Sequence, residues 1–281
     1  MKRTEHNTAI RRTTLAILAV FLFFLPAFLN ITSTAAAPSF PDRYAGEDHW
    51  YDLSFMWFSN IAEGHFYLER GKKAGEYRAI LDAETKGFLG WLTSYRKHRY
   101  ISTMETIELK GEKRLRSRHF MRKVIKGDRI ETTESIIDYD RGLVKTIETK
   151  HGSEPLISEL RIPENLVYED LLSAYFNLKG GIFGAIRNGT YLTIDTIPRK
   201  GMSKIRIKAL EKDESAKLEK IDGAAFVFRV EVEKSFFGQT DGLVWVWTDA
   251  ELVPIYGRVE NVVGFGDVRG SLKTALPSTG K

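Results

Sequence analysis

Hydrophobic and polar side chains alternate in three successive runs after residue 50. Every second residue is apolar or aromatic over Tyr51–Trp57, over Ala62–Leu68 and over Tyr77–Ala83. A period of two is typical of β-strands that pack one face and expose the other. The turn signals Ser59-Asn60 and Gly71-Lys72 separate the runs, and connections this short join antiparallel neighbours. The pattern therefore predicts antiparallel strands.

The alternation returns in the second half of the chain. Six further strands are expected there: Tyr191–Ile197, Lys204–Leu210, Ala225–Glu233, Gly242–Trp247, Ile255–Val262 and Val268–Leu272. In one of them Trp245 and Trp247 alternate with Val244 and Val246. Both faces of that strand are apolar, which is typical of a central buried strand.

One segment breaks the period of two. Residues 168–179 place apolar side chains at helical spacing, namely Leu171, Leu172, Tyr175, Phe176 and Leu178. Asp170 suits the N-cap or first turn, and Gly180-Gly181 suits the C-terminal cap. Phe88–Leu92 is consistent with a second, short helical turn or a loop. The charge-rich segment Glu211–Lys220 is consistent with a solvated turn or hairpin end.

These elements predict a mainly β fold in one β-rich domain, residues 38–281, with a core of about 44–273. We expect a single curved antiparallel sheet or half-barrel, with the Asp170–Lys179 helix packed on its concave face. Roughly 245 residues can bury one sizeable core without covalent staples. The chain has no cysteine, which excludes disulfides, thiolate metal sites and thiol catalysis.

The first 37 residues have the pattern of an export signal. Four basic residues precede the apolar run Leu15–Leu29, and the small residues Thr32–Ala37 follow it. This predicts a signal peptide over residues 1–37, cleaved between Thr34 and Pro38, and a periplasmic protein. The alternative is an uncleaved inner-membrane anchor, since residues 15–31 would span about 26 Å as a helix, against a hydrocarbon core of ~30 Å.

Charge and motifs exclude several other functions. The formal net charge is +5, of which the leader contributes +3 through four basic residues and one acid, so the remainder carries only +2. We therefore expect no nucleic-acid partner. The histidines lack metal-ligand spacing, and neither a G-x-S-x-G nor an H-E-x-x-H motif is present, so we expect no metal, no cofactor and no catalytic residues. Asp249 and Glu251 could form an acid/base pair, but a turn in which Asp249 directs Pro254 into the next strand fits better.

Four arginines lie at even spacing in a run of basic residues: Arg114, Arg116, Arg118 and Arg122. On one strand, Lys113–Val124, they would share a face. That face could bind the phosphates of lipid headgroups or an anionic partner. The alternative is a solvent-exposed face paired across a hairpin with Glu131 and Glu134.

Aromatic side chains supply a second candidate surface. The stripe comprises Phe55, Trp57, Phe66, Tyr175, Phe176, Phe226, Phe228 and Trp245, together with Trp247. Ordinary core packing explains most of them. However, one short helix covers little of a curved sheet, and an uncovered apolar face marks a ligand groove.

Three stretches carry a resemblance to a known family. They are Gly46-Glu47 leading into the Tyr51–Trp57 strand with the turn before Gly64, the helix start Tyr168–Ser173, and Leu243–Asp249 followed by Leu252–Ile255 and a last strand ending near Leu272. The chain resembles the bacterial domain-of-unknown-function 3108 family over nearly all of residues 44–273, although Thr248 stands where the family usually has Ser. The resemblance implies an exported β-rich envelope protein, similar in architecture to the half-barrels of lipoprotein-localisation factors. It supplies no catalytic residues.

Taken together, the patterns predict an exported, non-catalytic protein that binds a lipid or other apolar envelope molecule as a carrier or chaperone. After signal cleavage, membrane contact would be only transient. The alternative is a structural protein of envelope assembly with an envelope protein partner and a packed interior. A continuous apolar cavity above about 300 Å³ favours binding, and a packed concave face favours the structural role.

Overall fold

The computed structural model describes residues 39–92, 94–199, 202–232, 242–262 and 266–273. Residues 38–281 form one compact unit. The predicted signal peptide and its alternative as an anchor lie outside the described residues. Within the described ranges, no helix is long and apolar enough to cross a membrane.

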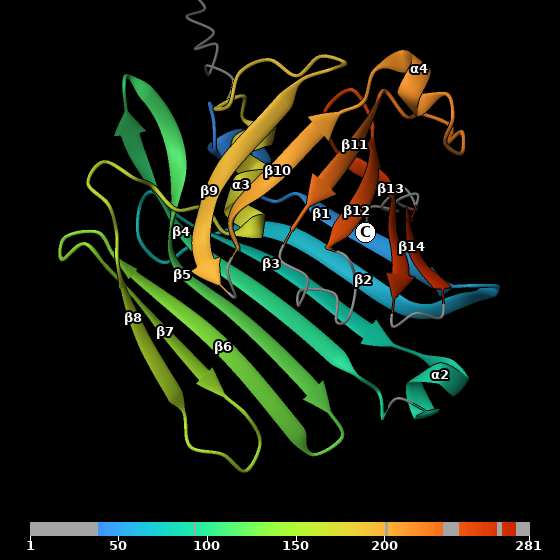
Figure 1. Ribbon diagram of the computed structural model, residues 1–281, viewed down its shortest axis with the longest axis horizontal. Coiled ribbons are helices and arrows are strands. Elements are labelled where there is room, and N and C mark those ends of the chain that lie inside the picture. The colour runs from blue at the N-terminus through green and yellow to red at the C-terminus, as the bar shows by residue number, and fades with distance from the viewer. Residues whose placement is uncertain (1–38, 93, 200–201, 233–241, 263–265, 274–281) are drawn as a thin grey trace, which may run out of the picture. The chain divides into compact units, whose positions relative to one another are not determined.

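Fourteen strands of the described chain form one sheet in which all neighbours are antiparallel (Figure 1). The first eight are β1 Asp48–Phe55, β2 Phe58–Arg70, β3 Glu76–Thr85, β4 Lys97–Leu109, β5 Glu112–Lys126, β6 Arg129–Asp138, β7 Leu143–Thr149 and β8 Leu156–Arg161. The remaining six are β9 Tyr191–Arg199, β10 Met202–Ala209, β11 Phe226–Glu231, β12 Leu243–Thr248, β13 Pro254–Val262 and β14 Gly266–Leu272.

The strand order is β8-β7-β6-β5-β4-β3-β2-β1-β14-β13-β12-β11-β10-β9. Sequential hairpins build each arm, and the pairing of β1 with β14 joins the arms at the centre. No pairing in the described part of the chain connects β8 to β9, so the sheet is open rather than closed into a barrel. This confirms the predicted fold class, a single mainly antiparallel sheet.

Helix α3, Leu171–Lys179, is the principal helix and was predicted from its spacing. The carboxylate of Asp170 accepts hydrogen bonds from the backbone N–H groups of Leu172 (2.8 Å) and Ser173 (2.9 Å), and Ser173 Oγ accepts one from the Asp170 N–H. This capping box satisfies N–H groups that would otherwise lack partners.

The helix packs on both arms of the sheet, as Figure 1 shows. Leu172 and Phe176 belong to the core formed with β2–β5. Ala174 and Leu178 belong to a second core, formed with β9–β11. The position of α3 on the concave side is therefore set by apolar side chains on two of its faces.

The other helices are short. They are η1 Asp42–Tyr44, α2 Gly87–Leu92 and α4 Lys212–Ser215. The helical alternative for Phe88–Leu92 is confirmed by α2, and α4 lies within the segment predicted as a solvated turn.

The first hairpin turns earlier than predicted. Phe55 pairs with Phe58, so the turn is at Met56-Trp57 and not at Ser59-Asn60. Met56 has φ +53°, a left-handed conformation that glycine or asparagine usually signals and that methionine does not. The expected strand Tyr51–Trp57 is cut short, and Trp57 lies at the exposed tip.

Candidate functional site

An apolar cavity of about 310 Å³ lies beside α3. Helix α3 lines one side, strands β10–β14 line the other, and β1–β3 complete the wall. The described lining residues are Tyr51, Phe66, Leu81, Leu171, Leu172, Ala174, Tyr175, Leu178, Ile205, Ile207, Phe228, Val230, Val232, Val244, Val246, Thr248, Leu252, Pro254, Tyr256, Gly257 and Gly270. None of them is charged, so the cavity suits an uncharged, apolar group.

Strand β12 sets one wall through alternate side chains. Val244, Val246 and Thr248 line the cavity. Trp247 is 1% exposed, and its ring packs against Tyr256 at 5.1 Å between ring centroids. Because alternate residues of a strand point to opposite faces, Trp245 shares the face of Trp247 and does not line the cavity. The predicted position of Trp245 in a groove is wrong because both faces of this strand are apolar, so alternation alone cannot choose between them.

Two glycines form part of the cavity floor. Gly257 of β13 pairs with Gly270 of β14 and with Val246 of β12. A Cβ atom on Gly257 would have the Trp245 carbonyl oxygen, at 3.7 Å, as its nearest neighbour, which is ordinary van der Waals contact. A Cβ on Gly270 would lie 3.0 Å from a methyl carbon of Leu53. At Gly257 the missing side chain therefore leaves room in the cavity.

The turn Asp249–Pro254 lines the cavity through Leu252 and Pro254. Asp249 Oδ1 accepts a hydrogen bond from the Val253 N–H at 2.8 Å, which confirms the turn interpretation of this residue. The hydroxyls of Tyr51 and Tyr175 donate to two carbonyl oxygens of the same turn, at 3.0 and 3.4 Å. Burial raises the pKa of both hydroxyls well above the ordinary value, so they remain protonated donors.

The residues of the predicted aromatic stripe do not all lie on one surface in the structure. Phe66, Tyr175 and Phe228 line the cavity. Phe176 is 1% exposed and lies in the core between α3 and β2. The described cavity wall excludes Phe55, Trp57, Phe226 and Trp245. The expected grouping of all eight residues on one groove is therefore wrong.

The predicted arginine face is also wrong. Thr103 pairs with His119 and Met104 with Ser117, so Arg118 is an extra residue in a β-bulge. A bulge shifts the alternation, and Arg122 therefore shares the face of the buried Phe120 and Val124 instead of the face of Arg116.

The arginine partners differ from those expected. Arg114 is paired with Glu169, and both Arg116 and Arg118 are paired with Glu105. The predicted partners Glu131 and Glu134 form none of these pairs. Their own strand begins to pair with β5 only at His119, beyond the first three arginines.

The sequence interpretation missed a buried acidic pair at the start of α3. Glu169 and Asp170 are both buried. The Glu169 carboxylate accepts hydrogen bonds from Arg114 and from Asn177 (2.8 Å). Burial raises the pKa of Glu169 to about 7 and also raises the pKa of Asp170. The one sequence signal was an acid immediately before a helix N-cap, which usually lies in solvent.

Polar groups beside this acidic pair fix α3 to both arms. Asn177 bonds to the N–H and the C=O of Leu115 at 2.9 and 2.8 Å, where β5 extends beyond its partner β6. On the other arm, the Glu169 N–H donates to the Asp195 carbonyl at 2.9 Å, and the Thr196 hydroxyl donates to the Glu169 carbonyl at 2.7 Å. The helix wall of the cavity is therefore held by polar contacts as well as by packing.

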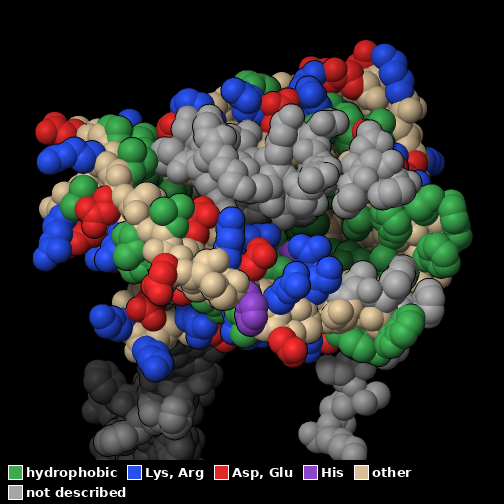
Figure 2. All heavy atoms as spheres, turned by 60° about the horizontal axis from the view of Figure 1, so that its bottom comes forward, with side chains coloured by type: hydrophobic (Ala, Val, Ile, Leu, Met, Phe, Trp, Pro, Cys, Tyr) green, Lys and Arg blue, Asp and Glu red, His purple; other side chains and the backbone are tan. Residues whose placement is uncertain are grey.

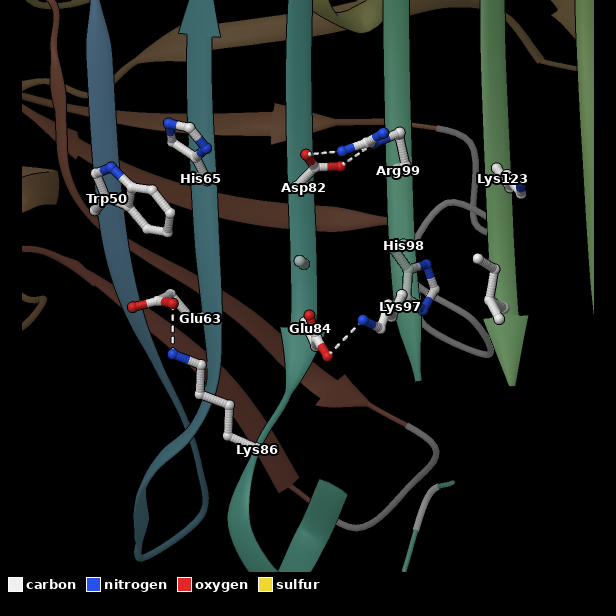
Figure 3. Close-up of a pocket in the computed structure, with 12 residues that line it drawn as sticks. Trp50, Glu63, His65, Asp82, Glu84, Lys86, Lys97, His98, Arg99 and Lys123 are labelled. Carbon is white, nitrogen blue, oxygen red and sulfur yellow. Dashed lines mark hydrogen bonds and ion pairs between the residues drawn. The ribbon is translucent and has the colours of Figure 1, made fainter. Parts of the chain in front are cut away.

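A second hollow, of about 410 Å³, lies over the opposite face of β1–β5 and differs in chemistry (Figure 3). Trp50 stacks on His65 at 3.9 Å between centroids. Arg99 donates two hydrogen bonds to the Asp82 carboxylate, at 2.7 and 2.8 Å, and further ion pairs flank them. No Ser, Thr, Cys or Tyr is among its described lining residues, and the ring of Tyr67 stacks on His65 at 4.4 Å between centroids.

Metal ligation has no support among the described residues. No group of three or more His, Cys, Asp or Glu side chains in those ranges is arranged to hold a metal ion. Three of the five histidines after the leader, His49, His65 and His119, each lie near a single carboxylate, at 3.4, 2.8 and 3.5 Å.

The fold and the cavity define a mainly β protein with one open sheet and an apolar cavity against a single principal helix. No known family model matches the chain, and no curated protein matches it. Among solved structures, it is similar to a beta-barrel-like protein of the domain of unknown function DUF1849 from Brucella abortus, with 13% identity and a TM-score of 0.34. The alignment covers 82% of this chain and 96% of that one. The resemblance to the domain-of-unknown-function 3108 family stays a prediction.

Proposed function

We propose that the protein is a non-catalytic binder of an apolar molecule, such as a lipid, and acts as a carrier or chaperone. The observation that carries the proposal is the cavity of about 310 Å³ whose described lining has no charged side chain. Its volume lies at the lower end of the range for ligand sites, about 300–1,000 Å³. An isolated apolar cavity of about 150 Å³ holds a benzene molecule, so this one has room for about twelve carbon atoms.

The proposal also includes the compartment in which the protein works. The pattern of residues 1–37 supports export to the periplasm, where the ligand would be an envelope molecule. The resemblance of residues 44–273 to the domain-of-unknown-function 3108 family supports the same compartment. The structural alternative, with an envelope protein partner and no ligand, predicts an interior that takes up no apolar molecule.

A substitution on the cavity floor tests the proposal. Gly257→Leu places four side-chain carbons in the cavity, and Gly257→Ala places one. Uptake of a fluorescent fatty-acid analogue is titrated for both variants and for the wild type, and denaturant melts check that each is folded.

We expect the wild type and Gly257→Ala to bind the probe, and Gly257→Leu to bind it at least ten-fold more weakly. Filling the space removes the site without removing a core contact. Absence of uptake by the wild type, or equal uptake by Gly257→Leu, contradicts the proposal and leaves the structural alternative.

A further inference from the structure

Large aromatic side chains are exposed at one end of the sheet. Trp57 is 76% exposed at the tip of the β1–β2 hairpin, and its ring lies 5.6 Å from that of the exposed Phe58. Trp91 in α2 is 66% exposed, and Tyr95 follows it in the turn before β4. We call these four residues the aromatic end. Exposed tryptophans grouped in this way mark an interaction surface.

The two parts of the aromatic end lie close together. The Lys86 N–H, directly before α2, donates to the Ile61 carbonyl of β2 at 2.6 Å. Phe58 is three residues further along the same strand, about 10 Å away at ~3.3 Å per residue. Figure 1 draws the hairpin tip and α2 at the same end of the molecule. Figure 2 shows hydrophobic side chains gathered on that side, next to a hollow.

The chain segment that contains α2 is itself basic. Residues 86–99 contain Lys86, Arg96, Lys97 and Arg99 and no Asp or Glu. The ammonium groups of Lys86 and Lys97 are half-exposed, and each is paired with a carboxylate of the sheet. Trp and Tyr rings beside Lys and Arg are the composition of membrane-interface segments, where rings lie at the headgroup level and cations contact anionic lipids.

The aromatic end also has a defined position relative to the cavity. Strands β1 and β13 run toward it, and β14 runs away from it. The turn Asp249–Pro254, which lines the cavity, precedes β13 and therefore lies at the opposite end. If the aromatic end rests on a surface, that surface faces the end of the cavity that lies away from the Asp249–Pro254 turn.

We propose that the aromatic end is a docking surface for a phospholipid membrane. The rings of Trp57 and Trp91 enter the headgroup region, and the basic side chains of residues 86–99 contact anionic headgroups. Docking does not depend on the proposed cavity ligand, so either idea can fail without the other. The sequence patterns predict transient membrane contact, and this proposal names the residues that make that contact.

The test uses the compact unit, residues 38–281, because the apolar run of residues 15–29 would itself enter membranes. Co-sedimentation is measured with vesicles of phosphatidylethanolamine and phosphatidylglycerol, and tryptophan emission is followed in the same samples. The variants are the double change Trp57→Ala with Trp91→Ala, and the single change Trp57→Lys. The matched control is Tyr191→Ala, another exposed aromatic, located at the start of β9 beside the end of β10.

We expect the wild type and Tyr191→Ala to bind the vesicles equally. The double variant should bind at least ten-fold more weakly, and Trp57→Lys should lack the part of the lipid-induced blue shift that Trp57 contributes in the wild type. Replacing the anionic lipid by phosphatidylcholine should weaken wild-type binding. Failure of the wild type to bind, or binding of both tryptophan variants at the wild-type level, overturns the proposal. Because Trp57 is mostly exposed, Trp57→Lys keeps the fold and gives a result even if the double variant does not.

Discussion

Two neighbouring residues of α3 separate a cavity role from a core role. Tyr175 lines the cavity, whereas Phe176 is 1% exposed and packs against Phe66, with ring centroids 5.5 Å apart. Replacing each by Ala removes an aromatic ring from the same helix turn. We expect the two variants to fail in different ways.

The magnitudes follow from burial. Phe176→Ala empties a fully packed site, and such changes cost about 3–5 kcal/mol. Tyr175 is only half-buried and one side of its ring borders existing empty space, so its loss should cost about 1–2 kcal/mol. The control Tyr175→Phe removes only the hydroxyl, whose hydrogen bond to a carbonyl is 3.4 Å long, and should cost less than about 1 kcal/mol.

Two assays distinguish the Tyr175 variant from the Phe176 variant. Denaturant melts give the free energy of unfolding, and titration with a fluorescent fatty-acid analogue gives the affinity of the folded protein. Tyr175→Ala should bind at least ten-fold more weakly with a small loss of stability. Phe176→Ala should lose stability and keep its affinity as long as it is folded. Equal losses of stability with no change in affinity for either variant would refute the assignment of Tyr175 to a binding wall.

Three further changes test the packing around the cavity. Trp247→Ala should lower the free energy of unfolding by about 3–5 kcal/mol in a denaturant melt; a loss below about 1 kcal/mol would mean that the side chain is not core. Asn177→Ala should cost about 2–4 kcal/mol, because the Leu115 N–H and C=O both lose their partner; an unchanged melt would contradict this. Burial raises the pKa of Glu169 from 4.5 to about 7. Between these two pH values, Glu169 is ionised in the unfolded chain but still protonated in the folded protein. The free energy of unfolding of the wild type should therefore fall by about 3 kcal/mol as the pH rises from 4.5 to about 7. Glu169→Gln should lack this fall in melts across pH, and parallel pH profiles would contradict the assignment.

The sheet and its principal helix could be predicted from the sequence because local patterns determine them. Alternation with short turns specifies antiparallel hairpins, and the Asp170 cap with apolar residues at helical spacing specifies α3. The first hairpin turn could not be placed, because Met56 adopts a left-handed conformation without glycine or asparagine.

The site was harder to predict because it depends on which face of each strand is inward. In β12 both Val246 and Trp247 are apolar, and only the three-dimensional packing turns the valine toward the cavity. In β5 the bulge at Arg118 reverses the faces of all later residues, and spacing alone does not reveal a bulge. The burial of Glu169 depends on Arg114 and Asn177, which are distant from one another in sequence and meet only after folding.

The most direct test of the account is native mass spectrometry of the protein purified without organic solvent from cells that produce it. The account predicts a population heavier than the polypeptide by one apolar molecule, which solvent extraction releases and which Gly257→Leu lacks. A single mass equal to that of the polypeptide, in a wild-type protein that also takes up no fatty-acid analogue, would contradict the account.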